Sequence, residues 1–322
     1  MKKDYKEKMP LVTVFTMTYR NLKFMKDTIL SVLRQTYSQI EFILADDGTI
    51  GFPLHEIETF IDENRRENIV CYEVFTQSQN VGTVKNANSI IGKAKGKYVF
   101  PLSCGDEFYE NSTIEKIVTR FEATNCDVLC CRRLLCTEKE LNPIRYMPAT
   151  MYLNKIEKID NKGEAYSAIV LQRFYEMASG AATYYTKKIL CEMGGFDTGY
   201  RLWEDGPFYV QYLRRGGKLN FQYDIISIRY RDGGVSKSKN KYMVQDVHRF
   251  IKKEMMDNIH LLGGYDVRYA KYLYHWTFDK KQLLNLIKYF DVVAYRFLYK
   301  VYCCYCVEKD KVEIRRQYNA DS

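Results

Sequence analysis

A central sheet flanked by helices, followed by a helical C-terminal extension, is the α/β fold that this sequence predicts. Four apolar segments, several of them rich in β-branched residues, alternate with segments whose apolar residues recur at helical spacing. The chain has 322 residues, of which 46% are hydrophobic, so it can bury one large core. Beyond residue 237 the sequence changes to basic, tyrosine-rich segments with helical periodicity.

The chain begins with a predicted strand, a helix and a second strand. Residues 11–17 alternate and are rich in β-branched side chains, which is typical of a strand. Asn21 is a suitable N-cap for the helix that follows, and residues 40–45 form the next apolar strand. Two strands joined by one helix make a right-handed βαβ unit, so both strands are expected to end at the same edge of the sheet.

Strands and helices continue to alternate as far as residue 135. We expect strands at residues 69–75, from residue 97 and at 127–135, with helices at 55–64, 86–94 and 114–121. No G-x-G-x-x-G run follows the first strand and no Walker A motif occurs. The sequence therefore favours neither a dinucleotide-binding fold nor a P-loop ATPase.

The segment from residue 141 to residue 236 is less regular. Residues 141–162 are polar and are expected to form an irregular loop. After this loop we expect a helix at 163–177, a strand at 181–186 and an acidic turn at 202–205. A helix through Tyr209, Leu213 and Arg214 then ends at residues 216–217, and two strands at 219–221 and 225–230 lead to a glycine-rich basic loop at 231–236.

Three acidic pairs stand at predicted turns: Asp46-Asp47, Asp106-Glu107 and Glu204-Asp205. The first two pairs follow parallel strands of one sheet, and in such sheets ligands bind outside the carboxyl ends of the strands. Since a buried carboxylate is costly without a partner, a divalent metal and a phosphate group are expected there. The third pair suits a base that deprotonates a hydroxyl nucleophile. A simpler interpretation is that the turn at Asp106 only caps the next helix.

The net charge of +9 is concentrated near the end of the chain, where residues 237–322 hold 17 Lys and Arg against 10 Asp and Glu. An anionic partner is therefore expected, and membrane phospholipid, nucleic acid or an anionic substrate would qualify. We expect no nucleic acid, because the basic tail lacks a docking motif and the front half carries an acidic crevice.

A helix is expected over residues 283–307. Lys288, Arg296 and Lys300 interrupt each of its apolar runs, so it is too charged to span a membrane. The helix is expected either to pack on the main domain or to contact a membrane surface or a partner, such as a second copy in a homodimer. Because residues 1–10 are charged and no apolar signal segment follows, we expect a cytoplasmic protein, at most peripheral at the inner face of the cell membrane.

Several motifs together resemble the inverting glycosyltransferases of family 2, which have the GT-A fold. The nucleotide-sugar half of that family is similar to residues 10–21, 31–37, 41–48, 80–82 and 95–99, and its acceptor half is similar to residues 194–197 and 203–205. The resemblance implies a GT-A domain at residues 1–236, with a Rossmann-like mixed sheet, a nucleotide-sugar half at about 10–135 and an acceptor half at about 136–236. Nothing comparable covers the extension at residues 237–322.

The resemblance also implies roles for individual residues. Six side chains would lie at the base and ribose of the nucleotide: Thr18, Tyr19, Asp46, Asp47, Lys85 and Asn86. Arg229 and Arg231 belong to a segment, residues 229–236, that resembles the part of the family that closes over the donor, and they would contact its phosphates.

The expected reaction follows from the same resemblance. Asp106 would carry the Mn²⁺ or Mg²⁺ ion that grips the diphosphate of the donor, a UDP-sugar in most members, with GDP- and dTDP-sugars as alternatives. Asp205 would be the general base that deprotonates the acceptor hydroxyl, and Glu204 would assist or orient the acceptor. The acceptor would be a glycan or a lipid-linked sugar in surface polysaccharide synthesis.

One departure from the family pattern concerns the metal site. The family usually has Asp-x-Asp-Asp where this chain has Ser103-Cys104-Gly105-Asp106, so two acids are missing. Asp106 occupies the position expected to bind the metal directly, and we therefore expect activity. The alternative is a catalytically silent homologue that binds sugar nucleotides or partners in an assembly complex.

Overall fold

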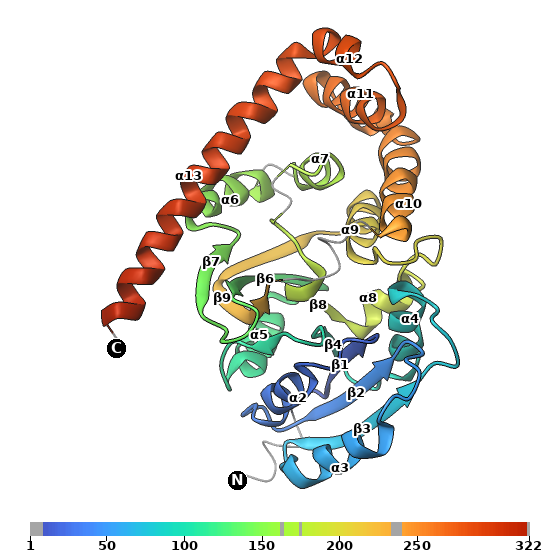
Figure 1. Cartoon of the computed structure of the whole chain (residues 1–322), viewed down its shortest axis with the longest axis vertical. Helices are drawn as coiled ribbons and strands as arrows, with labels where there is room; N and C mark the ends of the chain where they lie inside the picture. The colour runs from blue at the N-terminus through green and yellow to red at the C-terminus, as the bar shows by residue number, and fades with distance from the viewer. Residues whose placement is uncertain (1–8, 162–163, 174–175, 233–239, 321–322) are drawn as a thin grey trace.

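A mixed sheet forms the centre of the protein in the computed structural model, which describes residues 9–161, 164–173, 176–232 and 240–320 (Figure 1). Its strand order is β3-β2-β1-β4-β8-β6-β9-β5, and β7 pairs with β6 outside this path. The strands are β1 (Val12–Thr18), β2 (Ile40–Asp46), β3 (Ile69–Thr76), β4 (Tyr98–Pro101), β5 (Glu107–Phe108), β6 (Val128–Cys136), β7 (Pro143–Met147), β8 (Thr183–Thr186) and β9 (Leu219–Arg231).

The first four long strands run parallel, and antiparallel pairs join them to the rest of the sheet. β1 pairs in parallel with β2 and β4, and β2 does so with β3. β8 then connects the halves, since it is antiparallel to both β4 and β6. β6 and β9 are parallel, whereas β5 and β7 add antiparallel edges. The mixed sheet expected from the sequence is confirmed.

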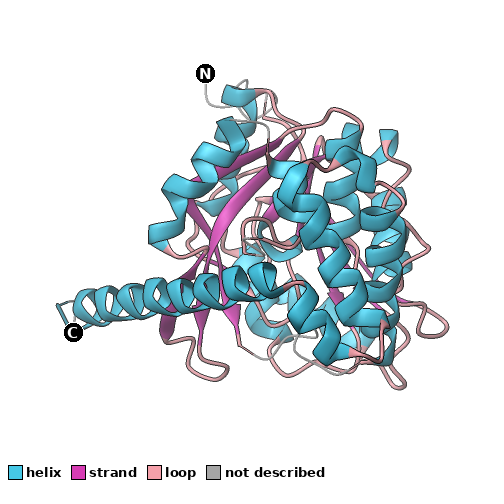
Figure 2. Ribbon diagram, turned by 90° about the horizontal axis from the view of Figure 1, so that it is seen from above, coloured by secondary structure: helices cyan, strands magenta, loops and turns pink. Residues whose placement is uncertain are grey.

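Helices cover both faces of the sheet, as Figure 2 shows. The helices α2 (Met25–Leu33), α3 (Leu54–Asn64) and α5 (Thr113–Thr124) pack on one face, and α4 (Thr83–Lys93), α8 (Lys187–Glu192) and α9 (Asp205–Arg214) pack on the other. The alternation of side chains along β1 explains why each face has its own core. Val12 and Val14 pack in the core with α2, α3 and α5, whereas Phe15 packs in the core with α4, α8 and α9. Side chains on successive positions of a strand point to opposite faces.

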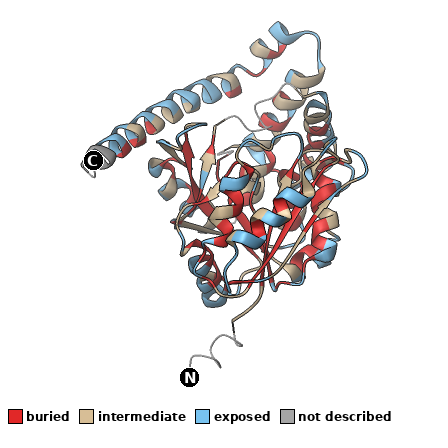
Figure 3. Ribbon diagram, turned by 60° about the horizontal axis from the view of Figure 1, so that its bottom comes forward, coloured by how far each residue is buried: buried red, intermediate tan, exposed pale blue. Residues whose placement is uncertain are grey.

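The C-terminal extension is helical, as expected. It consists of α10 (Lys241–Phe250), the π-helix η4 (Ile251–Met256), the 3₁₀-helix η5 (Ile259–Leu261), α11 (Gly264–Phe278), α12 (Gln282–Lys288) and α13 (Phe290–Ala320). Aromatic and aliphatic residues of α10, η4 and α11 join the core that α4, α8 and α9 share. Figure 3 shows that buried residues concentrate in the sheet and the helix faces toward it, whereas much of α13 is exposed.

The long helix α13 lies beside α6 and β7 (Figure 1). Cys306 is buried among residues of the 3₁₀-helix η1 (Thr150–Tyr152) and of α6 (Leu153–Asn161). Asp310 accepts the Thr150 N–H through both carboxylate oxygens, at 3.2 and 3.0 Å, and lies 3.7 Å from the Arg132 guanidinium. Helix α13 is therefore attached to η1 and β6 by a buried ionic contact.

Three predictions for the second half were wrong. Residues 141–162 contain β7, η1 and α6, because β7 adds to the edge of β6 and α13 covers the segment from outside. The helix predicted at 163–177 is limited, in the described residues, to α7 (Ala165–Val170). The two strands predicted at 219–230 are one strand, β9, whose pairing with β6 shifts register where the sequence pattern was interrupted.

Two predicted features lie partly or wholly outside the described residues. These are the charged opening of the chain, residues 1–8, and most of the glycine-rich loop, residues 233–236. Within the described ranges, every helix falls short of the length and apolar character needed to cross a bilayer.

Candidate active site

The carboxyl ends of β1, β2 and β4 bring the first two acidic turns together. The Asp47 N–H donates to the Thr18 carbonyl at 2.9 Å, and the Cys104 N–H donates to the Met17 carbonyl at 3.4 Å. The turns that follow β2 and β4 are thus both hydrogen-bonded to the end of β1. This edge is where open α/β sheets bind ligands.

The carboxylates of Asp46 and Asp47 are both occupied by hydrogen bonds within the protein. Asp46 accepts bonds from the Thr49 N–H and hydroxyl, each at 2.6 Å, and from the Thr76 hydroxyl at 2.7 Å. Asp47 accepts the backbone N–H groups of residues 81 and 82 at 2.7 and 2.9 Å, and the Asn80 amide at 2.8 Å. Burial raises the pKa of Asp47 against the effect of these bonds. Both aspartates therefore fix the loops around the predicted nucleoside pocket.

The other residues predicted for that pocket differ in accessibility. Tyr19 is exposed at the end of β1, with the Arg20 guanidinium 4.9 Å from the centre of its ring. Lys85 is exposed on α4. In contrast, the Thr18 hydroxyl donates to the Asn21 carbonyl. The buried Asn86 amide donates to the Ala45 carbonyl near the end of β2 and accepts a bond from the Gln77 amide. Tyr19 and Lys85 are thus accessible, whereas the other two side chains are engaged.

Asp106 keeps one carboxylate oxygen without a partner. Its side chain is only 4% exposed, and Oδ1 accepts the Arg231 N–H at 3.0 Å. Oδ2 is buried and has no hydrogen bond. Burial raises the pKa of Asp106 to about 7, although the Arg231 N–H and the charges of Arg133 and Arg231 lower it.

This orphaned oxygen fits the metal that the sequence implied. Within the described ranges no three His, Cys, Asp or Glu side chains gather to hold an ion. A magnesium-like ion does not require such a cage, because it commonly uses one or two carboxylates together with substrate phosphates and water. Asp106 is the residue that would hold it.

The two arginines predicted to contact phosphate have different environments. The Arg231 guanidinium is buried and donates to the Gly105 carbonyl at 2.6 Å, to Glu107 at 2.6 Å and to Asp27 at 3.2 Å. Arg231 thus secures the turn that carries Asp106. Arg229 is exposed on β9, opposite Glu107, and is free of such bonds among the described residues.

Glu204 and Asp205 stand at the start of α9. Asp205 accepts the Gly206 N–H at 2.7 Å and the Gly180 N–H at 2.6 Å. A Cβ atom at Gly180 would lie 2.9 Å from a Glu204 carboxylate oxygen and 3.2 Å from one of Asp205, so this close approach requires glycine.

Burial shifts the titration of this pair. It raises the pKa of Glu204 to about 8, with the Asp205 charge adding to the effect. Burial also raises the pKa of Asp205, while the two N–H bonds and the Arg133 charge oppose the shift. Two carboxylates whose pKa values lie above the ordinary range are typical of groups that exchange protons near neutral pH.

Asp246, a residue that the sequence did not indicate, holds the turn in front of this pair. Its carboxylate, on α10 of the extension, is 4% exposed and accepts the backbone N–H groups of Arg201 at 3.0 Å, Leu202 at 2.6 Å and Trp203 at 3.1 Å. Phe250 of the same helix packs on Trp203, with ring centres 4.6 Å apart. Consecutive N–H groups that converge on one anion form a stable nest.

Arg201 links this turn to the donor half. Its guanidinium donates to the Asn80 side-chain oxygen at 2.6 Å and to the Asn80 carbonyl at 3.0 Å. Asn80 in turn bonds to Asp47. A continuous chain of hydrogen bonds therefore joins the loops of both halves to the extension. No local pattern in the sequence indicated it, because its members are far apart along the chain.

Replacing Asp246 by Ala is expected to destabilise the protein by about 2–4 kcal/mol, because three N–H groups would lose their acceptor. Asp246→Asn, which keeps one oxygen acceptor, should cost less. Urea unfolding followed by circular dichroism measures both. The exposed Asp257→Ala, in the same extension, is the control and should change stability by less than ~0.5 kcal/mol. Equal effects of Asp246→Ala and the control would contradict the role of Asp246.

Replacing Glu204 by Gln is expected to alter the dependence of stability on pH. Native Glu204 holds its proton up to about pH 8, whereas an unfolded glutamate loses it near pH ~4.3. Between these values the native state binds more protons, so wild-type stability falls as pH rises. Relative to wild type, Glu204→Gln should gain more than ~1 kcal/mol between about pH 5 and pH 8. Urea unfolding across this range measures the difference, and parallel profiles would disprove the shift.

Relatives by sequence support one family. A profile described as "Glycosyl transferase family 2" matches residues 13–178. An uncharacterized glycosyltransferase of Haemophilus influenzae is 31% identical over 116 residues, so this chain matches about a third (34%) of that relative's length. Glycosyltransferase GlyG of Streptococcus pneumoniae is 23% identical over 88% of this chain and 93% of its own. A putative teichuronic acid biosynthesis glycosyltransferase, TuaG of Bacillus subtilis, is 28% identical over 33% of this chain and 40% of its own.

Solved structures share the fold. A mannosyltransferase of Pyrobaculum calidifontis, in complex with GDP-Man and Mn²⁺, covers 96% of this chain and 88% of its own, with 12% identity and a TM-score of 0.55. Residues 1–349 of Staphylococcus aureus TarS, in complex with UDP-GlcNAc, cover 97% of this chain and 92% of their own, with 14% identity and a TM-score of 0.54. The profile match spans more than half of the chain, and we conclude that this protein belongs to glycosyl transferase family 2 and has the GT-A fold.

Proposed function

We propose that this protein is an inverting glycosyltransferase that moves a sugar from a nucleotide-diphosphate sugar, a UDP-sugar in the first instance, to a hydroxyl of a glycan or lipid-linked acceptor. The observation that carries the proposal is the buried Asp106 Oδ2, a carboxylate oxygen without a partner at the ligand-binding edge of the sheet. Two further buried carboxylates, Glu204 and Asp205, also have raised pKa values, and the Arg133 charge lowers the pKa of Asp205 as it lowers that of Asp106. A metal-and-phosphate site and a proton acceptor are the two parts such a reaction needs.

The donor would bind at the ends of β1, β2 and β4. Tyr19 and Lys85 are the accessible side chains there, and Asp47 fixes the loop beside them. A Mn²⁺ or Mg²⁺ ion on Asp106 would neutralise charge on the departing diphosphate. Arg231 would keep Asp106 in place, while the exposed Arg229 would be free to approach the phosphates.

Asp205 would take the proton from the acceptor hydroxyl. Its raised pKa makes its carboxylate a stronger base than that of an ordinary aspartate, and the Gly180 and Gly206 N–H groups fix its orientation. Glu204, which holds its own proton near neutral pH, would donate a hydrogen bond to the acceptor. Attack from the face opposite the diphosphate would invert the anomeric carbon.

By analogy, we place the acceptor in surface polysaccharide synthesis, which the name of the Bacillus subtilis relative supports.

The second candidate function is that of a catalytically silent homologue that binds sugar nucleotides or partners. The observation in its favour is that Ser103 and Gly105 stand at positions where the family usually has acids, and that within the described residues no three His, Cys, Asp or Glu side chains form a metal cage.

Calorimetric titration of UDP, GDP and dTDP, with and without Mn²⁺, separates these functions. We expect metal-dependent binding of one nucleotide, and a loss of at least tenfold in affinity for Asp106→Asn, since one charged ligand is removed. Asp205→Asn should bind the same nucleotide normally but transfer sugar at least ~100-fold more slowly, because a general base contributes about that factor. Failure of folded wild-type protein to bind any of the three nucleotides would rule out the transferase.

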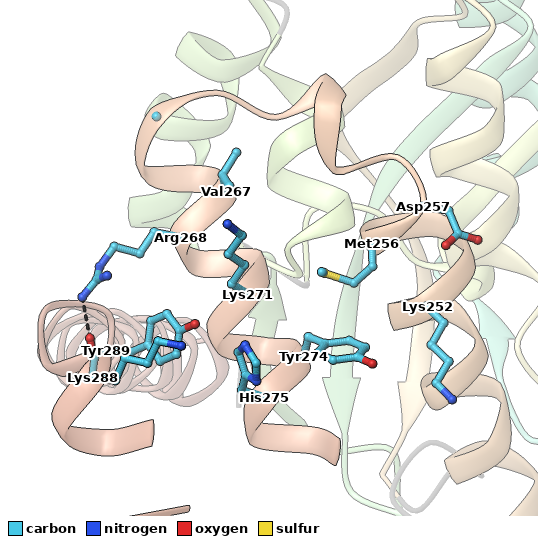
Figure 4. A pocket seen from close by; sticks show the side chains of 11 residues that line it. Lys252, Met256, Asp257, Val267, Arg268, Lys271, Tyr274, His275, Lys288 and Tyr289 are labelled. Atoms are coloured by element: carbon cyan, nitrogen blue, oxygen red, sulfur yellow. Dashed lines mark hydrogen bonds between the residues drawn. The ribbon is translucent and has the colours of Figure 1, made fainter. Parts of the chain in front are cut away.

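We further propose that the extension contacts the inner face of the cell membrane. Helix α12 and the first residue of α13 expose large apolar side chains, with Leu283 at 73%, Ile287 at 70% and Phe290 at 71% exposure. Beside them lies a hollow of about 980 Å³ that is lined by Lys252, Lys271 and Lys288 among others (Figure 4). Exposed apolar residues next to lysines that form no ion pair with any described residue fit the interface of an anionic bilayer.

Flotation with vesicles tests this contact. Wild-type protein should float with phosphatidylcholine vesicles that contain phosphatidylglycerol and should float much less with phosphatidylcholine alone, because lysines near an anionic surface contribute about 1 kcal/mol each. The variant Leu283→Asn with Ile287→Asn should stay in solution, whereas the distant exposed Ile50→Asn is the control and should float as wild type does. Sedimentation velocity distinguishes a homodimer: a dimer abolished by the double variant, with no flotation of wild type, would contradict membrane contact.

A further inference from the structure

Two neighbouring buried arginines on β6 differ in their partners. Arg132 and Arg133 are 7% and 8% exposed. Arg132 donates to the Pro148 carbonyl at 2.9 Å and to the Thr150 hydroxyl at 2.7 Å, and its guanidinium lies 3.7 Å from Asp310. Among the described residues the Arg133 guanidinium has no hydrogen bond and no ion pair, and its Nε is sealed from solvent.

The Arg133 guanidinium packs against an aromatic ring. Its guanidinium lies 5.3 Å from the centre of the Tyr230 ring on β9. A ring face supplies a modest attraction, but it supplies no acceptor for the five N–H donors of a guanidinium. A buried charge without a counterion is strongly unfavourable, and arginine cannot avoid this by releasing its proton. Such a group is therefore expected to meet an anion that enters from outside.

The position of Arg133 indicates where this anion binds. Arg133 pairs with Ile228 of β9, and three residues later the backbone of the same strand, at Arg231, donates to Asp106. The Arg133 charge acts on Asp106 and also on Asp205 at the start of α9. Through β9, Arg133 is therefore linked to the strand end that holds Asp106, the carboxylate assigned to the metal.

We propose that Arg133 binds a phosphate group of the substrate. This inference rests on the proposed function, because it assigns a ligand to the same site. A guanidinium presents paired N–H donors that match two oxygens of a phosphate, which is why arginine is the common partner of this group. The phosphate belongs either to the diphosphate of the donor or to a phosphate of the acceptor.

Arg133 binds the phosphate directly, whereas Arg231 holds the protein. The difference is visible in their contacts: Arg231 is saturated by Gly105, Glu107 and Asp27, and Arg133 is bonded to none of the described residues. The sequence favoured Arg231 because it lies in a loop with a family resemblance. Burial and the absence of a hydrogen bond or ion pair among the described residues instead single out Arg133.

The test compares Arg133→Met with Arg132→Met, a matched substitution of the buried neighbour whose partners are all in the protein. Calorimetry at constant Mn²⁺ uses five probes: pyrophosphate, uridine, UDP, GDP and dTDP. Glycerol 3-phosphate is then titrated into the nucleotide-loaded protein. Urea unfolding without ligand is measured on the same samples.

We expect Arg133→Met to weaken phosphate binding about 10- to 100-fold, to leave uridine binding unchanged and to raise the unfolding midpoint, because an unpaired buried charge is removed. Arg132→Met should lower the midpoint and leave phosphate binding unchanged. Arg133→Lys, which keeps the charge but not the fork, should restore part of the affinity. If Arg133 only stabilised the fold, Arg133→Met would not weaken phosphate binding while raising the unfolding midpoint.

The probes separate the two sources of phosphate. Loss of nucleotide affinity in Arg133→Met assigns the donor diphosphate. Unchanged nucleotide affinity with loss of glycerol 3-phosphate binding assigns the acceptor. If wild type binds pyrophosphate through Arg133 but none of the three nucleotides, the proposed function fails and the phosphate site stands. Absence of phosphate binding in wild type, or equal effects of both methionine variants on it, would overturn the inference.

Discussion

Carboxylates that accept backbone N–H groups hold the turns and loops around Asp46, Asp47, Asp205 and Asp246 in the described part of the candidate site. A loop cannot satisfy its own N–H groups as a helix or strand does, and each one left unbonded in a buried position costs free energy. Here acidic side chains supply the acceptors, both within one turn or helix, as Asp46 at Thr49 and Asp205 at Gly206, and between elements, as Asp47 at residues 81 and 82, Asp106 at Arg231, Asp205 at Gly180 and Asp246 at residues 201–203.

This form of support has an electrostatic consequence. Burial removes hydration from these carboxylates and raises the pKa values of Asp106, Glu204 and Asp205, and repulsion from neighbouring carboxylates adds to the shift for Asp106 and Glu204. The same crowding prepares the site for a cationic ligand at Asp106, whose Oδ2 has no bond. Arg133 is the opposite case, a buried cation with no hydrogen bond or ion pair among the described residues. Together these groups suit a ligand that carries both a metal ion and phosphate.

The C-terminal extension is part of the site's support. Its helix α10 supplies Asp246 to the turn before Glu204, and α13 supplies Asp310 to the acceptor half. The hydrogen bonds from Asp47 through Asn80 and Arg201 to Asp246 cross from the donor half to the extension. We therefore propose that residues 237–322 fold with the GT-A domain as one unit.

Local sequence determined the first half of this protein. Alternating apolar segments and short turns fixed the parallel strands β1 to β4 and their helices, because each βαβ unit is built from neighbouring residues. The same regularity placed Asp46 and Asp106 at one edge of the sheet. The family resemblance came from the same segments, since their motifs are contiguous.

Tertiary structure decided the rest, because the interactions concerned join distant residues. Pairing with β6 makes a strand of residues 143–147, although their own pattern is irregular. Asp246 meets the turn at Arg201 only after α10 has packed on it, some 45 residues along the chain. Arg231 is hydrogen-bonded to acceptors from other elements, whereas Arg133 has no hydrogen bond among the described residues, and only the packing of several elements decides this difference. Local patterns fix which elements form, and only packing fixes which polar groups are left for a ligand.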